Sequence, residues 1–487
     1  MEEFHLKTQK KNYVILLVLL LVSALLLSAC GDSSQGTADA GNGSQTAAAD
    51  SGSSAGSPAP PMRGDENAPG FPPEGNAPAR PPEGNAPAMP PEGAGNVPGF
   101  PADSAGSGTA NAPDSSSDAY SEAFSKRDLS GEYDSAEAVT ISLNGASAAA
   151  SSESVQISGG SVTITAAGTY ILTGSLDDGS VIVDATKEDK VQLVLNGVSI
   201  QSSDYAAIYV KQADKVFVTL AAGTENSLTG GGSFVQRDEN DVDAVVFAKD
   251  DITFNGVGTL HINAPAGSGI VGKDEVTITA GVYEITANKH AIRAKDSLAI
   301  ADGSFTLTAS EDGLHAENGD DETLGSIYIA GGSFTIQVKD DAIHATTLLR
   351  IDGGSFQITA AEGLEGTYIQ INGGDIQISA SDDGVNAARK SSLYTPTFEM
   401  NDGSLTVVMG AGDTDGIDSN GNIIVNGGTI NVTGQSSFDY DGSAQYNGGT
   451  IIVNGQQLDS IPNQMIGRGG MGGNGGFGGG RGGGKRR

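Results

Sequence analysis

Apolar and polar residues alternate strictly in short segments of this chain, and turns containing glycine separate the segments. In the segment SIYIAGGSFTIQV (326–338), Ile327, Phe334 and Ile336 fall on one face and Thr335 falls on the other. Alternation over so few residues between glycine turns predicts half-buried β-strands and no helices. The pattern recurs at 348–360, 367–379 and 422–434, and in a looser form at 168–185, 189–202, 206–223 and 243–264.

A short unit with an apolar centre recurs between these strands from about residue 268 to residue 455. The centres are Ile270, Ile292, Leu314, Ile343, Leu364, Val385, Ile417 and Phe438, separated by 22, 22, 29, 21, 21, 32 and 21 residues. A period near 21–22 with occasional insertions is typical of a solenoid, whose stacked coils place like positions about 4.8 Å apart. The handedness rule for parallel crossovers favours right-handed coils. The sequence therefore predicts an all-β fold, a right-handed parallel β-helix.

Polar residues occupy two fixed positions around these centres. Two residues before the centre stand Asp312, Asp341, Glu362, Asp383 and Asp415. One residue after it stand His315, His344, Glu365, Asn386, Asp418 and Asp439. An Asp-Gly turn in each coil explains one acid per repeat. It does not explain a second column made only of residues that can bind a metal ion.

The stacked acids predict a bound cation. Two carboxylates about 5 Å apart, at an effective dielectric constant of about 20, repel each other by roughly 3 kcal/mol. A row of them is costly, or stays partly protonated, unless a cation lies among them. Oxygen ligands of this kind suit Ca²⁺ better than Zn²⁺. We therefore predict Ca²⁺ as the cofactor, and a purely structural row of acidic turns is the alternative. The predicted ligands are Glu362, Glu365, Asp383, Asp415, Asp418, Asp439, Asp341 and Asp312.

Two histidines in the second column raise the question of a transition metal. His315 and His344 each follow an Asp by three residues, and the repeat predicts that they stack on adjacent coils. Their column offers neither a third such ligand nor a Cys. The sequence therefore favours ordinary hydrogen bonds between each His and its Asp.

The two ends of the chain differ from the repeats in composition. Residues 1–29 combine a basic start with a long apolar run and end before Cys30, in a Leu-Ser-Ala-Cys sequence that resembles the bacterial lipobox. We predict a lipoprotein signal peptide over 1–29 and a lipid on Cys30, with a chance Cys beside an apolar segment as the alternative. The predicted protein is exported and anchored through this lipid to the outer face of the bacterial cytoplasmic membrane. Residues 30–130, rich in Pro, Gly, Ser and Ala, predict a disordered tether. A β-helix domain over 131–460 and a disordered Gly/Arg-rich tail over 461–487 complete the prediction.

Charge limits the partners of the predicted domain. The chain carries −34, and residues 30–466 hold 18 Lys or Arg against 58 Asp or Glu, a net charge of −40. A polyanionic body excludes nucleic acid as a partner and favours cations. We expect a monomer.

Four phrases resemble a known family. EGLEG (362–366), SDDGVNAA (381–388), DTDGIDSNGNIIVNGG (413–428) and FDYDG (438–442) closely resemble a bacterial carbohydrate-binding β-helix family. That family is found in exported proteins of clostridia and their relatives and is similar in structure to the pectate lyases. The resemblance covers about residues 136–456 and implies binding of acidic plant cell-wall polysaccharide. It also implies calcium at Glu362, Glu365, Asp383, Asp415, Asp418 and Asp439, although Ser436 and Ser437 depart from the family before the last centre.

The combined prediction is a protein that binds Ca²⁺ and a polyuronate-type polysaccharide without cleaving it. The absence of Trp speaks against a flat aromatic platform for neutral glycans. Tyr328 and Arg350 are predicted to point outward on neighbouring coils, either to hold sugar or as plain exposed strand residues. One alternative is a Ca²⁺-dependent lyase, which needs a Lys or Arg base, but no basic residue stands in a catalytic motif. The other is a surface scaffold or adhesin that Ca²⁺ makes rigid.

Overall fold

The computed structural model describes residues 112–113, 120, 123–411 and 414–464. The predicted signal peptide, Cys30, and most of the predicted tether and tail lie outside these residues. Within the described part the protein is all-β, with 36 strands joined into one sheet system and no helix. Accordingly, no helix of this part is long and apolar enough to cross a membrane.

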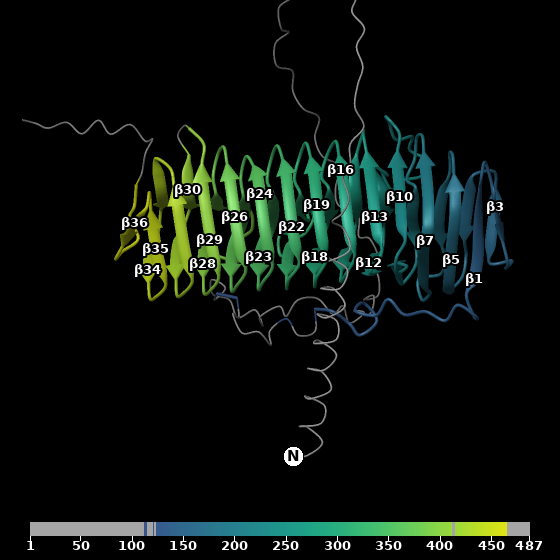
Figure 1. The fold of residues 1–487 in the computed structure, drawn as a ribbon, viewed down its shortest axis with the longest axis horizontal. Helices are drawn as coiled ribbons and strands as arrows, with labels where there is room; N and C mark the ends of the chain where they lie inside the picture. Colours follow the sequence, from purple (N-terminus) through teal and green to yellow (C-terminus); the bar gives the residue numbers. More distant parts are fainter. Residues whose placement is uncertain (1–111, 114–119, 121–122, 412–413, 465–487) are drawn as a thin grey trace, which may run out of the picture. The chain divides into compact units, whose positions relative to one another are not determined.

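Three parallel ladders of strands form the body of the protein, and each coil contributes one strand to each ladder (Figure 1). The first ladder contains β14 (Ser268–Gly272), β17 (Ile292–Ala294), β20 (Leu314–Ala316), the start of β23 (Ile343–Ile351), the start of β25 (Leu364–Ile371), β27 (Val385–Ala387), β30 (Asp415–Ser419) and β33 (Ser436–Tyr440). The second contains β15 (Glu275–Ile278), β18 (Ser297–Ile300), β21 (Ser326–Ile329), the ends of β23 and β25, β28 (Thr397–Met400), β31 (Asn422–Val425) and β34 (Ala444–Tyr446). The third contains β16 (Val282–Ala287), β19 (Ser304–Ala309), β22 (Ser333–Val338), β24 (Ser355–Ala360), β26 (Asp375–Ala380), β29 (Ser404–Met409), β32 (Thr429–Thr433) and β35 (Thr450–Val453).

The looser coils and the two ends complete the stack. The earlier coils are β5 (Gly168–Leu176), β6 (Ser180–Asp184), β7 (Lys190–Ser202), β8 (Ile208–Gln212), β9 (Lys215–Leu220), β10 (Glu225–Gly230), β11 (Ala244–Ala248), β12 (Asp251–Gly256) and β13 (Thr259–Ala264). Antiparallel pairs occur only at the ends of the described stack: β1 (Val139–Gly145) with β2 (Ala148–Ala150), β3 (Val155–Ser158) with β4 (Ser161–Ile164), and β35 with β36 (Gln456–Leu458). Such pairs protect the edges that a stack of parallel coils leaves open.

The core confirms the predicted periodicity. All eight apolar centres are fully buried, and Ile292, Leu314 and Ile343 pair with one another in register. In the third ladder, Phe334 stacks between the rings of Phe305 and Phe356, with 4.6 Å between centroids on each side. The predicted parallel β-helix is therefore confirmed, whereas its right-handed sense stays a prediction.

Two insertions account for the two long separations between centres. Residues 317–325 follow β20, and residues 388–396 follow β27, on the same side of the stack. The insertions contact each other, because the Ser391 hydroxyl donates to the Glu322 carbonyl oxygen at 2.6 Å. The two insertions therefore lie together along the edge of the first ladder where β20 and β27 end.

A segment before the first strand covers part of the second ladder. We call the described residues 112–113, 120 and 123–132 the covering segment. Its Asp128 is 3% exposed, accepts a hydrogen bond from Thr253 at 2.7 Å and pairs with Lys215 at 3.0 Å. Contacts with the β-helix therefore begin within the predicted tether, N-terminal to residue 131.

The covering segment also corrects one expectation from the sequence. Tyr328 and Arg350 do pair in register on the outer side of the second ladder, as predicted. However, they are only 6% and 1% exposed, because the Tyr120 ring lies over both of them. The prediction that they point into solvent is wrong, and neither is available to bind sugar in this structure.

Candidate functional site

The register of the first ladder places the residues after the apolar centres in one outward-facing column. Each residue pairs with its counterpart on the next coil because the coils repeat without a shift at this position. The column runs Arg293, His315, His344, Glu365, Asn386, Asp418 and Asp439. The second column predicted from the sequence is therefore present in the structure.

The residues two before the centres form the other column, and some of them link neighbouring coils. The Asp341 backbone N–H donates to Asp312 Oδ1 at 3.0 Å, and the Asp415 N–H donates to Asp383 Oδ1 at 3.0 Å. His290 holds the same position one coil earlier, and its Nδ1 accepts from the Asp312 N–H at 3.3 Å. Backbone hydrogen bonds in the turns thus account for one carboxylate oxygen of Asp312 and one of Asp383.

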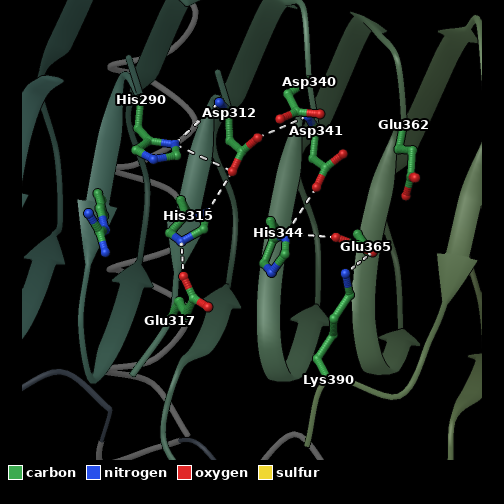
Figure 2. Close-up of a pocket in the computed structure, with 11 residues that line it drawn as sticks. His290, Asp312, His315, Glu317, Asp340, Asp341, His344, Glu362, Glu365 and Lys390 are labelled. Carbon is green, nitrogen blue, oxygen red and sulfur yellow. Dashed lines mark hydrogen bonds and ion pairs between the residues drawn. The ribbon is translucent and has the colours of Figure 1, made fainter. Parts of the chain in front are cut away.

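The part of the two columns between His290 and Glu365 lines an open groove of about 530 Å³ over the first ladder (Figure 2). The groove contains three groups of three residues, and within each group the ligand atoms lie within 4.8 Å of one another. They are His290 with Asp312 and His315, Asp312 with Asp341 and His344, and Asp341 with Glu362 and Glu365. The groove therefore changes along its length from a histidine-rich end to a carboxylate-rich end.

The carboxylate cluster consists of Asp341, Glu362 and Glu365. Its members come from two adjacent coils, at the turn into β23 and at the start of β25. Glu362 also accepts a hydrogen bond from the Asn386 amide at 2.9 Å, and the other end of that amide, Asn386 Oδ1, is buried without a hydrogen-bond partner. A buried amide oxygen on a side chain that contacts Glu362 fits the all-oxygen donor set that Ca²⁺ prefers.

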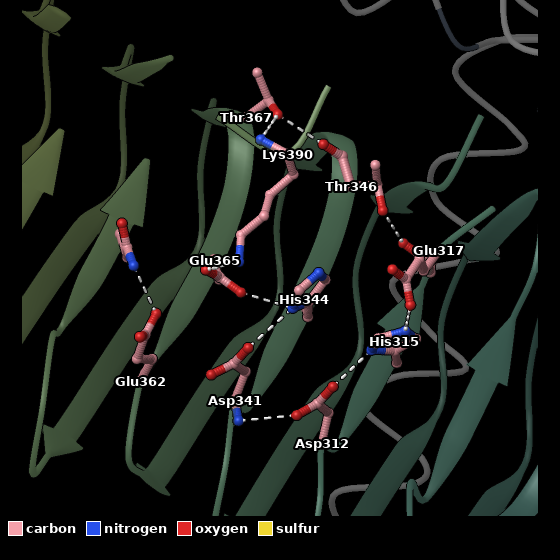
Figure 3. A network of polar contacts seen from close by, with 12 residues as sticks. Asp312, His315, Glu317, Asp341, His344, Thr346, Glu362, Glu365, Thr367 and Lys390 are labelled. Atoms are coloured by element: carbon pink, nitrogen blue, oxygen red, sulfur yellow. Dashed lines mark hydrogen bonds and ion pairs between the residues drawn. The ribbon is translucent and has the colours of Figure 1, made fainter. Parts of the chain in front are cut away.

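Two cationic side chains contact the carboxylate cluster at Glu365 (Figure 3). His344 Nδ1 lies 2.7 Å from Glu365 Oε2 and 2.9 Å from Asp341 Oδ2, and Lys390 Nζ lies 2.6 Å from Glu365 Oε1. Lys390 belongs to the second insertion, and its backbone N–H donates to the Thr367 hydroxyl at 3.0 Å. The insertion thus positions a lysine over the groove.

Electrostatics distinguish these groups. Burial opposes a charge on His344, but its hydrogen bonds to Asp341 and Glu365 outweigh burial and raise its pKa to about 10. The same is true of Lys390, where the hydrogen bond to Glu365 outweighs burial and raises the pKa. Burial raises the pKa of Glu362 to about 7, and the charge of Glu365 adds to the shift. The cations therefore neutralise Glu365 and leave Glu362 without a positive partner among these side chains.

The acidic row continues along later coils. Burial and neighbouring acids raise the pKa of Asp383 to about 7, and burial together with Asp383 and Asp439 raises the pKa of Asp418 to about 7. These values mean that stacked carboxylates hold protons near neutral pH when no cation is present. The electrostatic cost predicted from the sequence therefore has a counterpart in the structure.

A family model matches the chain over most of the β-helix. A family model described as "Carbohydrate-binding domain-containing protein" matches residues 158–411 and 361–460, which together span more than half of the chain. The chain belongs to this carbohydrate-binding family. The match includes both columns of the groove and excludes the covering segment.

Two individual proteins, one curated relative and one solved structure, are similar to this chain. A curated relative from Acetivibrio thermocellus, also named carbohydrate-binding domain-containing protein, is 36% identical over 137 residues, or 28% of this chain. The match covers 48% of that relative, so the chain spans about half of the relative's length. A solved structure of a polysaccharide lyase-like protein from C. thermocellum, a gadolinium derivative, shares 30% identity with a TM-score of 0.44. That similarity covers 49% of this chain and 94% of the solved one.

The structure brings together some of the predicted ligands of this carbohydrate-binding protein and separates others. Asp341, Glu362 and Glu365 form one cluster, whereas Asp312 lies between two histidines. Within the described residues, no three-residue group within 4.8 Å includes the later acids. These later acids are Asp383, Asp415, Asp418 and Asp439.

Sequence reasoning missed three residues of the groove: His290, Glu317 and Lys390. Glu317 begins the first insertion, outside the repeat. His290 stands two residues before Ile292, so extending the first column by one coil would have found it. Lys390 stands in an insertion, outside the repeat, and no periodic signal predicts its position. The sequence therefore contained a signal for the histidine only.

Proposed function

We propose that this carbohydrate-binding protein binds Ca²⁺ through the carboxylate-rich end of the groove and uses the ion to bind an acidic polysaccharide without cleaving it. The observation that carries the proposal is the convergence of Asp341, Glu362 and Glu365 from two coils, with ligand oxygens within 4.8 Å of one another. Ca²⁺ accepts six to eight oxygens at flexible geometry, so it can take oxygens from the protein and from a uronate together. Asn386 Oδ1, buried and without a hydrogen-bond partner, is a further ligand in this proposal.

The acidic charge of the chain supports an ion-mediated contact. A surface with this excess of carboxylates repels a polyuronate, and a bound divalent cation reverses the sign of the local field. We extend the same Ca²⁺ chemistry to the acids that stack on the later coils, beyond the groove: Asp383, Asp415, Asp418 and Asp439. Export and a lipid anchor on Cys30 are part of the proposal, because a plant cell-wall polysaccharide meets the protein outside the cell.

Absence of cleavage follows from the state of the basic groups. β-Elimination from a uronate needs a base that is unprotonated near the working pH. The two candidates beside the cluster, Lys390 and His344, both have raised pKa values because they pair with Glu365. While they pair with Glu365 they therefore serve as cations, and we infer that neither acts as a base.

Calcium binding is tested by titrating Ca²⁺ into the chelator-treated full-length protein and measuring the heat. We expect saturable binding to the native chain. Glu362→Gln should weaken it at least about 10-fold, since outer-shell changes at metal sites already have effects of this size. The matched control is Asp375→Asn, which removes an equal charge from an exposed position of β26, and its affinity should equal that of the native chain. Equal loss in both variants, or no binding to the native chain, would contradict the proposal.

A Ca²⁺-dependent polysaccharide lyase is the second candidate, favoured by one observation. Lys390 Nζ lies 2.6 Å from a member of the carboxylate cluster, so a cation that displaces it from Glu365 would free a basic group beside bound uronate. The test is the ultraviolet absorbance of the unsaturated product formed from polygalacturonate with Ca²⁺. We expect no product from the native chain or from Lys390→Met. Product from the native chain that disappears in Lys390→Met, with unchanged calcium affinity, would establish the lyase.

A further inference from the structure

Three imidazole rings stack along the histidine-rich end of the groove. The ring centroids of His290 and His315 are 4.5 Å apart, and those of His315 and His344 are 4.8 Å apart. His344 belongs to the carboxylate-rich end, because its Nδ1 lies between Asp341 and Glu365. His290 and His315 instead share a single carboxylate, that of Asp312 (Figure 2).

We propose that His290, Asp312 and His315 form a second metal site, for a borderline divalent transition metal such as Zn²⁺. Two imidazole nitrogens and one carboxylate oxygen suit Zn²⁺ and its neighbours, whereas Ca²⁺ takes oxygen ligands. The proposal does not depend on calcium binding at the other end of the groove. Under this proposal Asp312 binds the transition metal and is not one of the Ca²⁺ ligands, in contrast to the prediction from the sequence.

The distances fit such a site with small adjustments. Asp312 Oδ2 lies 3.4 Å from His290 Nδ1 and 2.6 Å from His315 Nδ1. Ligand atoms about 2.0–2.2 Å from a tetrahedral Zn²⁺ lie roughly 3.3–3.5 Å from one another. The first pair already has this spacing, and the second would widen by less than about 1 Å on exchanging its hydrogen bond for a shared metal ion.

The second nitrogen of each ring faces another carboxylate. His290 Nε2 lies 3.0 Å from Glu311 Oε2, and His315 Nε2 lies 3.4 Å from Glu317 Oε2. Metal-bound histidines are commonly oriented in this way, by a carboxylate on the nitrogen remote from the metal. In this proposal Nδ1 of both residues faces the metal and Nε2 is the oriented nitrogen. His290 Nδ1 then gives up the hydrogen bond that it accepts from the Asp312 backbone N–H at 3.3 Å, and an additional ligand can come from solvent or substrate.

A second observation comes from the burial of His315. Its side chain is 7% exposed, and its buried Nε2 makes no hydrogen bond, with the Glu317 carboxylate 3.4 Å away as its charged neighbour. A buried ring nitrogen with no hydrogen bond is costly unless another interaction fixes the ring. Metal binding at Nδ1 would fix the ring and strengthen the contact of the Nε2 proton with Glu317. Arg293, which also lines the groove, pairs in register with His315 on the neighbouring coil.

The test is a titration of the chelator-treated full-length protein with Co²⁺, which replaces Zn²⁺ and gives visible absorption bands when bound by few ligands. We expect saturable bands that Zn²⁺ abolishes. Sulfur-to-cobalt charge transfer should be absent, since the only cysteine, Cys30, is not a ligand. His290→Asn and His315→Asn should each weaken binding at least about 10- to 100-fold. His261→Asn is the matched control, because this histidine pairs with Glu284 in the third ladder, away from the groove.

Two further measurements separate the loss of cobalt binding from misfolding and from the loss of calcium binding. Circular dichroism checks that each variant is folded, and His290, with a 14% exposed side chain, provides the variant that perturbs the core less. Glu362→Gln should keep the cobalt bands, and His290→Asn should keep native calcium affinity. Bands absent from the native chain, bands that survive in folded His290→Asn, or bands lost equally in His261→Asn would overturn the proposal.

Discussion

Replacing Phe334 by Ala is expected to destabilise the coils around it by about 3–5 kcal/mol, the usual range for removing a buried aromatic ring. Phe334 is 1% exposed and lies almost parallel to the rings of Phe305 and Phe356, with interplanar angles of 2°. The substitution therefore leaves a cavity and removes two ring contacts, each worth about 0.5–1.5 kcal/mol. Neighbouring coils cannot close the cavity, because their ladder hydrogen bonds fix the spacing.

The effect should be measured by hydrogen exchange of the amides in β19, β22 and β24, since a solenoid can open locally without unfolding as a whole. Thr335→Ala is the matched control, because this residue follows Phe334 in the same strand and points into solvent. It should change protection by no more than about 0.5 kcal/mol. Equal loss of protection in the two variants would contradict the packing described for the third ladder.

Replacing Arg350 by Met is expected to destabilise the second ladder by about 3 kcal/mol. The Arg350 guanidinium is fully buried and makes two bonds to Asp352, from Nε at 2.7 Å and from Nη2 at 2.9 Å. Removing one partner of a buried pair costs about 3–5 kcal/mol, because the other charge stays buried without compensation. The lower value applies here because the Asp352 side chain is 19% exposed and because Tyr328 and Asn372 continue to donate to it.

Chemical denaturation followed by circular dichroism measures this loss, and Arg389→Met is the control, since Arg389 is exposed. Arg389→Met should lie within about 0.5 kcal/mol of the native chain. Arg350→Met should also expose the covering segment to proteases, because Arg350 holds the Tyr120 ring at 4.3 Å. An Arg350 variant of native stability would mean that this side chain is a surface residue, as alternation alone predicted.

The contrast between Phe334 and Arg350 shows what the sequence could and could not predict. Alternation fixes which residues of a strand face the core, so Phe334 was predicted correctly. It cannot show what covers the outer side of a strand. The covering segment lies more than 200 residues before Arg350 in the chain and has no periodicity, so nothing in the repeat predicts their contact.

The candidate site likewise has features that the repeat predicts and features that it does not. Period and register predicted the two columns, because a fixed repeat length puts like residues side by side on adjacent coils. Which column members come together depends on side-chain contacts: Glu362 joins Asp341 and Glu365, whereas Asp383 accepts a hydrogen bond from the Asp415 N–H. Lys390 reaches the groove only because its insertion folds back over β25 through Thr367. Contacts made by insertions are tertiary, and the repeat does not encode them.

The central claim is most directly tested by titrating polygalacturonate into the chelator-treated full-length protein, with and without Ca²⁺, while heat and ultraviolet absorbance are followed together. We expect saturable binding only with Ca²⁺, no rise in absorbance, and loss of binding in Glu362→Gln. Binding that is equal without Ca²⁺, or a rise in absorbance from an unsaturated product, would contradict a calcium-bridged binding protein. No binding under either condition would contradict it as well and would leave a scaffold stiffened by Ca²⁺.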